Sequence, residues 1–411
     1  MNEYTQFVDQ LQHHLSIQDD MDSTEWESKA IRFVDGLAGE ELRRLVDIDT
    51  RREFGAFFTS SETANALLVE PLLDYSGACV FYDPAVGAGN LLIAARNASA
   101  DTASEVTLLG TDLHEEFIAA AHLRHQINEA LIPHDNLCNI ELCVADGSLE
   151  NDYYHRATHI ITNPPFHQVM AGPEIAWAAG KVSSAALFID KITDFILPGT
   201  AVLAILPDVL RSGSRYEKWR KMVESKCSVQ SITMLGQFDK FADIDVFSIL
   251  LFKHSAQTLN VPNFPWKPKV NNGPCIEELF FVSVGNVVDN RDALEGPELP
   301  FIVSRGLESW SEITSAKRMR KFKGGAIQSP FVVIKRTSRM GDKFRATATI
   351  INMPSSVYID NHLIVLRPKS GKLSDCKSLL KKLQCEEINQ WIDQQIRCRH
   401  LTVKVVSRIP I

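Results

Sequence analysis

Short apolar runs alternate with longer, helix-compatible segments between residues 80 and 253. This alternation predicts the strands and helices of a largely parallel α/β sheet. Successive runs end on, or are closely followed by, a carboxylate or an amide: Asp83, Asp112, Asp146 and Asn163. In open α/β sheets, ligands bind at the carboxyl ends of the strands. The pattern therefore predicts that these side chains share one binding site.

Other patterns flank this region on both sides. Residues 1–48 predict helices, with a helix start at residues 23–25. A linker-like stretch is marked by Pro262, Pro265, Pro268 and Pro274. Beyond it, we expect strands at residues 331–335 and 362–368 and a helix at residues 378–397. A second, smaller folded region is therefore expected after the linker.

A glycine turn, D-P-A-V-G-A-G at residues 83–89, follows the first apolar run. Glycines let the backbone approach a bound ligand closely, because no Cβ intrudes. The turn lacks the third glycine of a dinucleotide fingerprint, and Asp83 would place a negative charge beside any phosphate. A cationic or zwitterionic ligand fits better, such as the sulfonium and amino acid part of S-adenosylmethionine. The alternative is an ordinary turn between a strand and a helix.

Two later carboxylates suit the other parts of such a ligand. Asp112 ends an apolar run at the distance, about 20 residues or more past the turn, where an acidic residue accepts hydrogen bonds from ribose hydroxyls. Asp146 would accept a hydrogen bond from the exocyclic amine of a bound adenine. The alternative for either carboxylate is that it caps the following helix.

The stretch N-P-P-F at residues 163–166 closes the apolar run at residues 159–162. Two consecutive prolines fix their own φ and push the residue before them out of the helical region. Asn163 is therefore expected on a rigid strand end, with its amide aimed outward and an aromatic ring three residues on. Such a site would hold a planar amine and cover one face of a ring. The alternative is a polar turn after a strand.

With these motifs, the sequence resembles the S-adenosylmethionine-dependent N6-adenine DNA methyltransferases, in the gamma-type motif order found in restriction-modification systems. The motifs that carry the resemblance are residues 163–166, residues 83–89, and G-A-F-F-T-S at residues 55–60. Departures from the family pattern occur at Ser60, Val86 and Asn90. The resemblance covers about residues 54–253.

The resemblance implies a fold. We expect a class I methyltransferase domain, Rossmann-like and mostly parallel, at residues 49–255. A reversed hairpin formed by residues 229–235 and 246–253 would close its sheet. An N-terminal helical extension would occupy residues 1–48, and a smaller α+β target-recognition domain would occupy residues 256–411.

The resemblance also implies a site. The catalytic residues would be Asn163, Pro164, Pro165 and Phe166. The cofactor S-adenosylmethionine would be bound by Phe58, Thr59, Asp83, Pro84, Gly87, Gly89, Asn90, Asp112, Leu113, Asp146, Gly147 and Asn163.

The implied mechanism is direct in-line methyl transfer to a flipped-out adenine. The Asn163 side-chain oxygen and the Pro164 carbonyl would accept hydrogen bonds from N6 and free its lone pair. Phe166 would stack on the base, while Phe238 and Phe241 would line its pocket. Neither a metal nor a covalent enzyme intermediate is required.

Charge is distributed unevenly along the chain, whose formal net charge is −8. Residues 304–411 contain 21 Lys and Arg against 8 Asp and Glu, a net charge of +13, which leaves −21 on the remainder. Such asymmetry is typical of a nucleic-acid-binding region. The candidate DNA-binding residues are Lys317, Arg318, Arg320, Lys321, Lys323, Lys335, Arg336 and Arg339. The alternatives are a solvated basic face, or a first cluster that orders only on the duplex.

Composition is that of an ordinary globular protein, at 411 residues and 45% hydrophobic. No apolar run approaches the ~18 residues of a membrane span. The eight cysteines contain no C-x-x-C pair, so we expect reduced thiols in the cytoplasm and no disulfide or zinc framework.

Other functions remain open at this point. One is an RNA methyltransferase acting on guanine N2 or adenine N6, since N-P-P-F followed by histidine, here His167, also occurs in such enzymes. Another is protein glutamine methylation, which prefers tyrosine where Phe166 stands. A third is a non-catalytic DNA-binding subunit of a modification complex. The expected partner is double-stranded DNA, with any restriction endonuclease or specificity subunit encoded separately.

Overall fold

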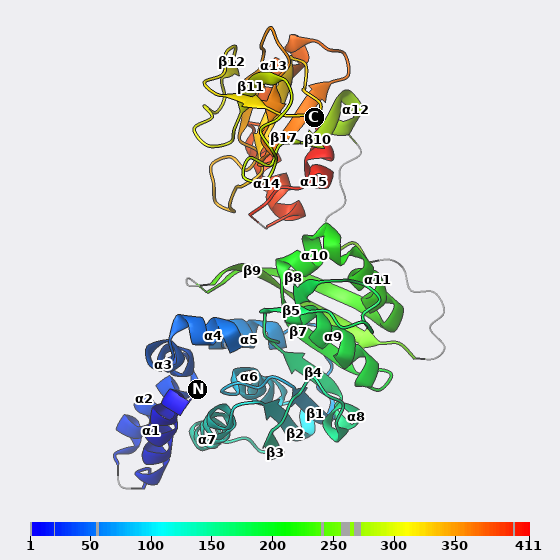
Figure 1. Ribbon diagram of the computed structural model, residues 1–411. Helices are drawn as coiled ribbons and strands as arrows, with labels where there is room; N and C mark the ends of the chain where they lie inside the picture. Colours follow the sequence, from blue (N-terminus) through cyan, green and yellow to red (C-terminus); the bar gives the residue numbers. More distant parts are fainter. Residues whose placement is uncertain are drawn as a thin grey trace. The chain divides into compact units, whose positions relative to one another are not determined.

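The computed structural model describes residues 2–19, 21–54, 57–239, 242–255, 264–266, 273–397 and 399–411. The chain divides into two compact units (Figure 1). The first comprises Met1–Leu210 and Ser214–Phe264, and the second comprises Arg211–Gly213 and Pro265–Ile411. Within the described residues, none of the helices combines the length and hydropathy that a membrane span requires.

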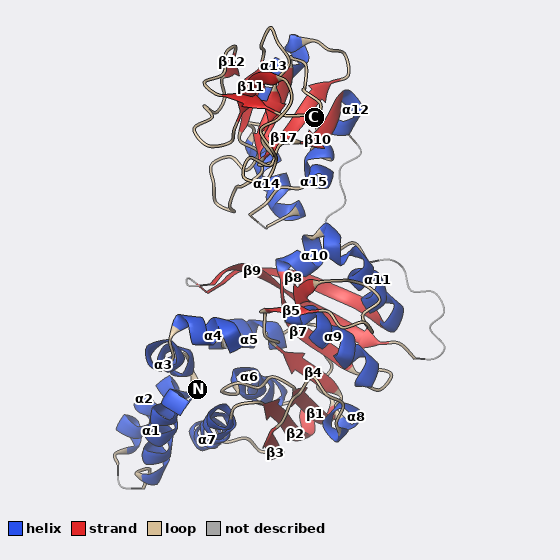
Figure 2. Ribbon diagram, viewed as in Figure 1, coloured by secondary structure: helices blue, strands red, loops and turns tan. Residues whose placement is uncertain are grey.

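The first unit is built on a seven-stranded sheet with the order β3-β2-β1-β4-β7-β9-β8 (Figure 2). Its strands are β1 (Gly77–Asp83), β2 (Ala103–Asp112), β3 (Leu137–Val144), β4 (His159–Thr162), β7 (Ala201–Pro207), β8 (Cys227–Asp239) and β9 (Ala242–Lys253). Neighbouring strands from β3 to β7 are parallel, whereas β9 runs antiparallel to both β7 and β8. This is the predicted class I methyltransferase sheet with its reversed hairpin, and the prediction of the fold class is confirmed.

Helices pack against this sheet in the first unit. They are α5 (Ser61–Leu68), α6 (Asn90–Ser99), α7 (Glu115–Leu131), α8 (Asp152–Arg156), α9 (Ser184–Phe195) and α11 (Glu217–Lys226). Shorter elements are β5 (Gln168–Met170), β6 (Lys181–Ser183) and the 3-10 turn η2 (Ser214–Tyr216). The short helix α10 (Asp208–Ser212) begins in the first unit, and its last two residues belong to the second. The strands β5 and β6 pair with each other as a separate hairpin directly after N-P-P-F.

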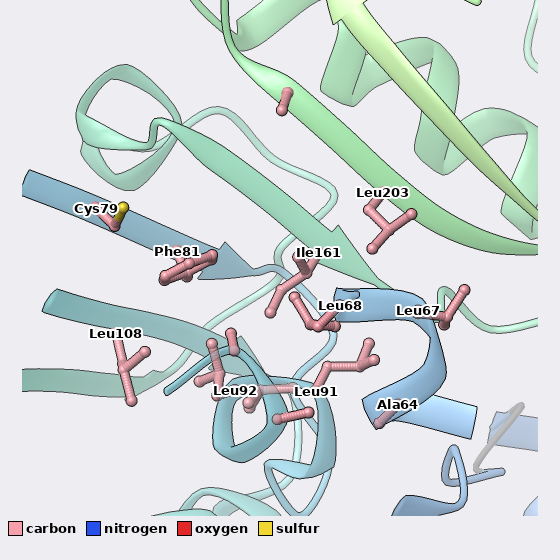
Figure 3. Packing of buried hydrophobic residues seen from close by; sticks show 14 of the residues in the cluster. Ala64, Leu67, Leu68, Cys79, Phe81, Leu91, Leu92, Leu108, Ile161 and Leu203 are labelled. Atoms are coloured by element: carbon pink, nitrogen blue, oxygen red, sulfur yellow. The ribbon is translucent and has the colours of Figure 1, made fainter. Parts of the chain in front are cut away.

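Apolar packing fixes the carboxyl ends of β1 and β4 against α5 and α6. Leu67 and Leu68 of α5 lie beside Leu91 and Leu92 of α6 (Figure 3). The same cluster contains Phe81 of β1, Ile161 of β4 and Leu203 of β7. The turn between β1 and α6 and the segment after β4 are therefore both anchored to one rigid core.

The N-terminal region is helical, as the sequence predicts. It contains the 3-10 turn η1 (Asn2–Tyr4) and the helices α1 (Thr5–Ser16), α2 (Ser23–Val34), α3 (Leu37–Leu45) and α4 (Ile48–Phe54). The Asp22 side chain caps α2 by accepting hydrogen bonds from the backbone N–H groups of Thr24 and Glu25. Both α1 and α2 pack against α7 of the sheet-containing fold.

The second unit contains two small sheets, ordered β10-β17-β14-β15-β12 and β13-β11-β16. Its strands are β10 (Phe280–Val284), β11 (Glu298–Ile302), β12 (Glu312–Ile313), β13 (Met319–Lys321), β14 (Phe331–Lys335), β15 (Ala348–Ile351), β16 (Tyr358–Ile359) and β17 (Leu363–Pro368). Its helices are α12 (Ile276–Leu279), α13 (Leu373–Lys382), α14 (Glu386–Gln395) and α15 (Val403–Ser407). The strands predicted at residues 331–335 and 362–368 are confirmed as β14 and β17.

The single helix predicted at residues 378–397 is wrong, because α13 and α14 are separate helices. Leu379 of α13 and Ile388 of α14 belong to the same buried cluster. At about 100° per residue, these two side chains would lie on opposite faces of one continuous helix. The break after Lys382 lets both face the core.

Candidate active site

A cavity of about 270 Å³ lies at the carboxyl ends of the parallel strands. The residues after β1, β2, β3 and β4 that line it include Pro84, Gly87, Asp112, Leu113, Asp146, Gly147, Asn163 and Pro165. A smaller adjoining hollow shares Phe57, Phe58, Ala85, Gly87 and Asn163 with this cavity and adds Thr59, Asp83 and Asn90. The strand ends singled out by the sequence pattern therefore meet at one place.

The glycine turn is held tightly against the end of β2. Gly87 has a φ of 51°, and a Cβ added there would lie 2.7 Å from Cε1 of Phe58. The Gly87 N–H donates to Oδ2 of Asp112 at 3.0 Å, while Oδ1 of Asp112 accepts from the His114 N–H at 3.0 Å. Only glycine fits this position, because its backbone lies in the left-handed region directly under an aromatic ring. Gly89, also predicted, takes a φ of 84° at the start of α6.

Of the predicted carboxylates, Asp83 is buried and Asp112 is half-buried. The Asp83 side chain is 1% exposed, and burial raises its pKa to about 7, although the Ala85 N–H donates to it at 3.0 Å. Burial also raises the pKa of Asp112, although the hydrogen bonds that it accepts from backbone N–H groups act to lower that pKa. Asp146 is exposed and accepts from the Ser148 N–H at 2.9 Å. Because a nearby positive charge favours the ionised form of a carboxyl, Asp83 and Asp112 together suit a cationic ligand.

Asn163 presents a buried acceptor beside the cavity. Its Nδ2 donates to the Phe57 carbonyl at 3.0 Å, which fixes which end of the amide carries the oxygen. Its Oδ1 is buried and has no hydrogen-bond partner among the described residues. A buried polar atom without a partner is costly, so a donor placed in the cavity beside Oδ1 would remove that cost.

The rest of N-P-P-F is arranged around Asn163. Pro164 is buried, and Pro165 lines the cavity while its carbonyl accepts a hydrogen bond from Oγ of Ser184. Phe166 is not among the described residues that line the cavity. Its ring packs edge-to-face on Phe238, with centroids 5.6 Å apart. The predicted stacking role of Phe166 stays a prediction.

Part of the earlier interpretation lies outside the described residues. Gly55 and Ala56 of the predicted cofactor motif, and Phe241, belong to this part. Of the remaining motif, Phe58 lines both hollows and Thr59 lines the smaller one.

The cavity is also lined by residues that were not predicted as site residues: Phe57, Ala85, His114, Phe117, Ala145, His167 and Phe188. His114 and Phe117 follow Asp112 at the start of α7, so extending the strand-end rule into the next helix would have found them. Phe188 lies within the apolar helix α9, where nothing in the sequence distinguishes it from a core residue. Burial lowers the pKa of His167, which favours its neutral form.

The basic residues of the second unit do not all face solvent. Lys317, Arg318, Lys321, Lys323 and Arg339 are exposed. Side chains alternate along β13, and Arg320 therefore points inward, is 5% exposed, and pairs with Asp289. Lys335 and Arg336 are half-buried and donate to the carbonyls of Leu307 and Asn361, both at 3.0 Å. The first basic cluster is thus partly a strand, and its outward residues form the accessible charge.

Known proteins resemble this chain in sequence and in fold. The family model described as N-6 DNA Methylase matches residues 44–261. The type IIG restriction endonuclease BpuSI is 14% identical, with a TM-score of 0.48 over 91% of this chain and 60% of its own. The methyltransferase subunit of a type I restriction-modification system from Streptococcus thermophilus is 19% identical, with a TM-score of 0.38 over 49% of this chain and 45% of its own.

A Listeria monocytogenes protein assigned to the class I S-adenosylmethionine-dependent methyltransferases is 16% identical, with a TM-score of 0.41 over 64% of this chain and 92% of its own. The chain spans less than two thirds of BpuSI and of the Streptococcus subunit. No curated protein matches the sequence.

Proposed function

Because the chain belongs to the N-6 DNA methylase family, we propose that it is a site-specific DNA methyltransferase that methylates the exocyclic N6 of adenine. One observation carries the choice of an amine as the acceptor of the methyl group. The Oδ1 atom of Asn163 is buried beside the cavity without a donor among the described residues, and an amine N–H supplies that donor.

The residues around the cavity fit S-adenosylmethionine as the methyl donor. The carboxyls of Asp83 and Asp112, whose pKa values burial raises, suit its positive groups, and Asp112 also lies where ribose hydroxyls are commonly bound. Gly87 leaves the space that a side chain would fill. When bound, S-adenosylmethionine supplies a methyl group that its sulfonium has already activated for transfer.

Asn163 and Pro164 act on the nucleophile. The Phe57 carbonyl holds Nδ2 of Asn163, so Oδ1 is fixed in place to accept one N6 hydrogen. The Pro164 carbonyl accepts the other. These bonds draw the nitrogen toward tetrahedral geometry and free its lone pair for in-line attack. Most of the rate comes from position and from prearranged dipoles.

The base must leave the duplex to reach this cavity. Pro165, His167 and Phe188 line the cavity together with Asn163 and would contact the extruded base. Phe166 would stack on the base once its ring leaves Phe238.

Duplex DNA is the proposed macromolecular partner. The exposed basic side chains of the second unit, Lys317, Arg318, Lys321, Lys323 and Arg339, would contact phosphates, which position the duplex without reading its sequence. A restriction endonuclease or a specificity subunit would be a separate protein.

The test is methyl transfer from labelled S-adenosylmethionine to unmethylated duplex DNA and to total RNA in parallel, followed by mapping of modified adenines. We expect N6-methyladenine at a discrete DNA motif. Label confined to RNA would favour an RNA methyltransferase. Binding of the cofactor without transfer to either substrate would point to a required partner subunit.

A further inference from the structure

Arg124 of α7 connects the N-terminal helices to the glycine turn. Its side chain is wholly buried. On one side its guanidinium donates to the carbonyls of Phe33, Val34 and Asp35, at 2.8, 2.6 and 3.3 Å. On the other side it donates to the Ala88 carbonyl and, at 2.5 Å, to Oδ1 of Asn90.

The partners of Arg124 explain how a buried cation is tolerated there. The carbonyls of Phe33 to Asp35 form the C-terminal end of α2, which carries the negative end of the helix dipole. The planar guanidinium can reach both sides at once, which an ammonium on a lysine stem cannot do as well. Burial lowers the pKa of Arg124 to about 10, so the side chain stays charged at neutral pH.

Asn90 links Arg124 to residues 57–59, which line the site. Because its Oδ1 accepts from Arg124, its Nδ2 points to the Thr59 carbonyl and donates to it. At the other end of the same segment, the Phe57 carbonyl accepts from Asn163. Residues 57–59 are thus held by an amide side chain at each end, with Phe58 lying over Gly87 between them.

We propose that Asn90 and Arg124 are positioning residues, which hold residues 57–59 in the conformation that binds S-adenosylmethionine and thereby couple the N-terminal helices to cofactor affinity. This inference rests on the proposed function. The oxygen and the nitrogen of the Asn90 amide each make a hydrogen bond within the protein, so its side chain is held in one orientation beside the smaller hollow.

The chain contains a matched control on the same two helices. Asn97 of α6 and Asn128 of α7 exchange amide hydrogen bonds at 3.3 and 2.9 Å. This pair joins α6 to α7 as Asn90 and Arg124 do, but Asn97 is not among the described residues that line either hollow of the site. A purely structural contribution should therefore be similar for both asparagines.

The experiment compares Asn90→Asp with Asn97→Asp in the full chain. Asn90→Asp keeps an acceptor for Arg124 but replaces the donor to Thr59 with a second oxygen facing its carbonyl. We expect the Kd of S-adenosylmethionine, measured by calorimetry, to rise at least tenfold for Asn90→Asp and less than twofold for Asn97→Asp. Hydrogen exchange in the ligand-free protein should accelerate in peptides covering residues 57–60 for Asn90→Asp alone.

Equal effects of the two variants on both readouts would overturn the inference, and so would an unchanged Kd for Asn90→Asp. Wild-type protein that binds no S-adenosylmethionine would instead reject the proposed function, while the exchange measurement would still report whether Asn90 orders residues 57–60. Arg124→Lys adds an independent check, since it keeps the positive charge and loses the planar guanidinium that donates to both sides at once. We expect a rise in Kd for this variant with DNA affinity unchanged.

Discussion

At the scale of single residues, Asn163 should affect chemistry far more than cofactor binding. Asn163→Ala removes the acceptor for the amine, and loss of one prearranged dipole in an active site lowers kcat by about 10²–10³-fold. The variant also loses the bond to Phe57, but Asn90 still holds the neighbouring Thr59. One lost neutral hydrogen bond of about 1 kcal/mol weakens binding roughly fivefold. Single-turnover rates and calorimetry separate the two effects, and near-wild-type turnover would contradict the proposed mechanism.

Asp83 should make stability depend on pH. Burial raises its folded pKa from 3.8 to about 7, so the folded state binds its proton more tightly than the unfolded chain does. The contribution of Asp83 protonation to the free energy of unfolding is fully present below pH 3.8 and is lost as the pH rises through 7. At about 1.4 kcal/mol per pKa unit, its total is on the order of 4 kcal/mol. Urea denaturation of wild type should therefore show a free energy of unfolding that falls between pH 5 and pH 8.

Asp83→Asn serves as the control for this prediction, because its side chain does not titrate, and its free energy of unfolding should fall less than that of wild type over the same pH range. A cationic ligand favours the ionised carboxyl, so the affinity of wild type for S-adenosylmethionine should rise over the same pH range. A wild-type profile that matches that of Asp83→Asn would show that Asp83 keeps an ordinary pKa.

Sequence reasoning at this scale succeeded where side chains follow strand ends. Asp83, Asp112 and Asn163 line the cavity or its adjoining hollow because parallel strands end at one edge of the sheet. It could not find Arg124, which lies in the middle of α7 and bonds mainly to backbone carbonyls. Every residue has a backbone carbonyl whatever its side chain, so neither spacing nor a motif in the sequence identifies the side chain that donates to it.

At the scale of elements, the N-terminal turn η1 supports the wall of the cavity. The Tyr4 ring packs edge-to-face on Phe117 and on Phe58, with centroid separations of 5.2 and 6.0 Å, and both partners line the cavity. Tyr4→Ala should lower the free energy of unfolding by about 3–5 kcal/mol and weaken S-adenosylmethionine binding. Thermal denaturation and calorimetry measure the two outcomes.

Tyr4→Phe provides the comparison, because it keeps the ring and removes only the hydroxyl that donates to the Ala38 carbonyl at 3.0 Å. We expect a loss of about 1 kcal/mol with cofactor affinity retained. If both variants bound the cofactor like wild type, η1 would stabilise the fold without shaping the site.

The break between α13 and α14 could have been predicted from the charges in the sequence. Lys381 and Lys382 end one helix, and Glu386 and Glu387 begin the next. Cations at a C-terminus and anions at an N-terminus match the helix dipole, so this order of charges marks a stop and a start. After Leu383 the apolar positions move to another face of a continuous helix. The prediction of one helix overlooked this change and relied on apolar periodicity alone.

At the scale of the whole molecule, the uneven charge is visible in the sequence, but its accessible part is not. Five of the seven residues at 317–323 are basic, yet the strand β13 turns Arg320 inward to Asp289 and leaves Lys321 outside. A strand of three residues is too short to show alternation against such a background. The structure therefore reduces the predicted DNA-binding residues to those whose charge is exposed.

The location of this charge should decide DNA affinity, and two double variants distinguish location from net charge. Lys317→Ala with Lys321→Ala, and Lys381→Ala with Lys382→Ala, each remove two exposed positive charges from the second unit. If Lys317 and Lys321 contact phosphates, the first pair lowers the slope of log K against log salt concentration by about 2, because each contact releases roughly one counterion. The second pair, on α13, should change the slope far less. Fluorescence anisotropy with a duplex over a series of salt concentrations measures both slopes. Equal changes in slope for the two double variants would mean that affinity depends only on total charge and that Lys317 and Lys321 do not contact the phosphates.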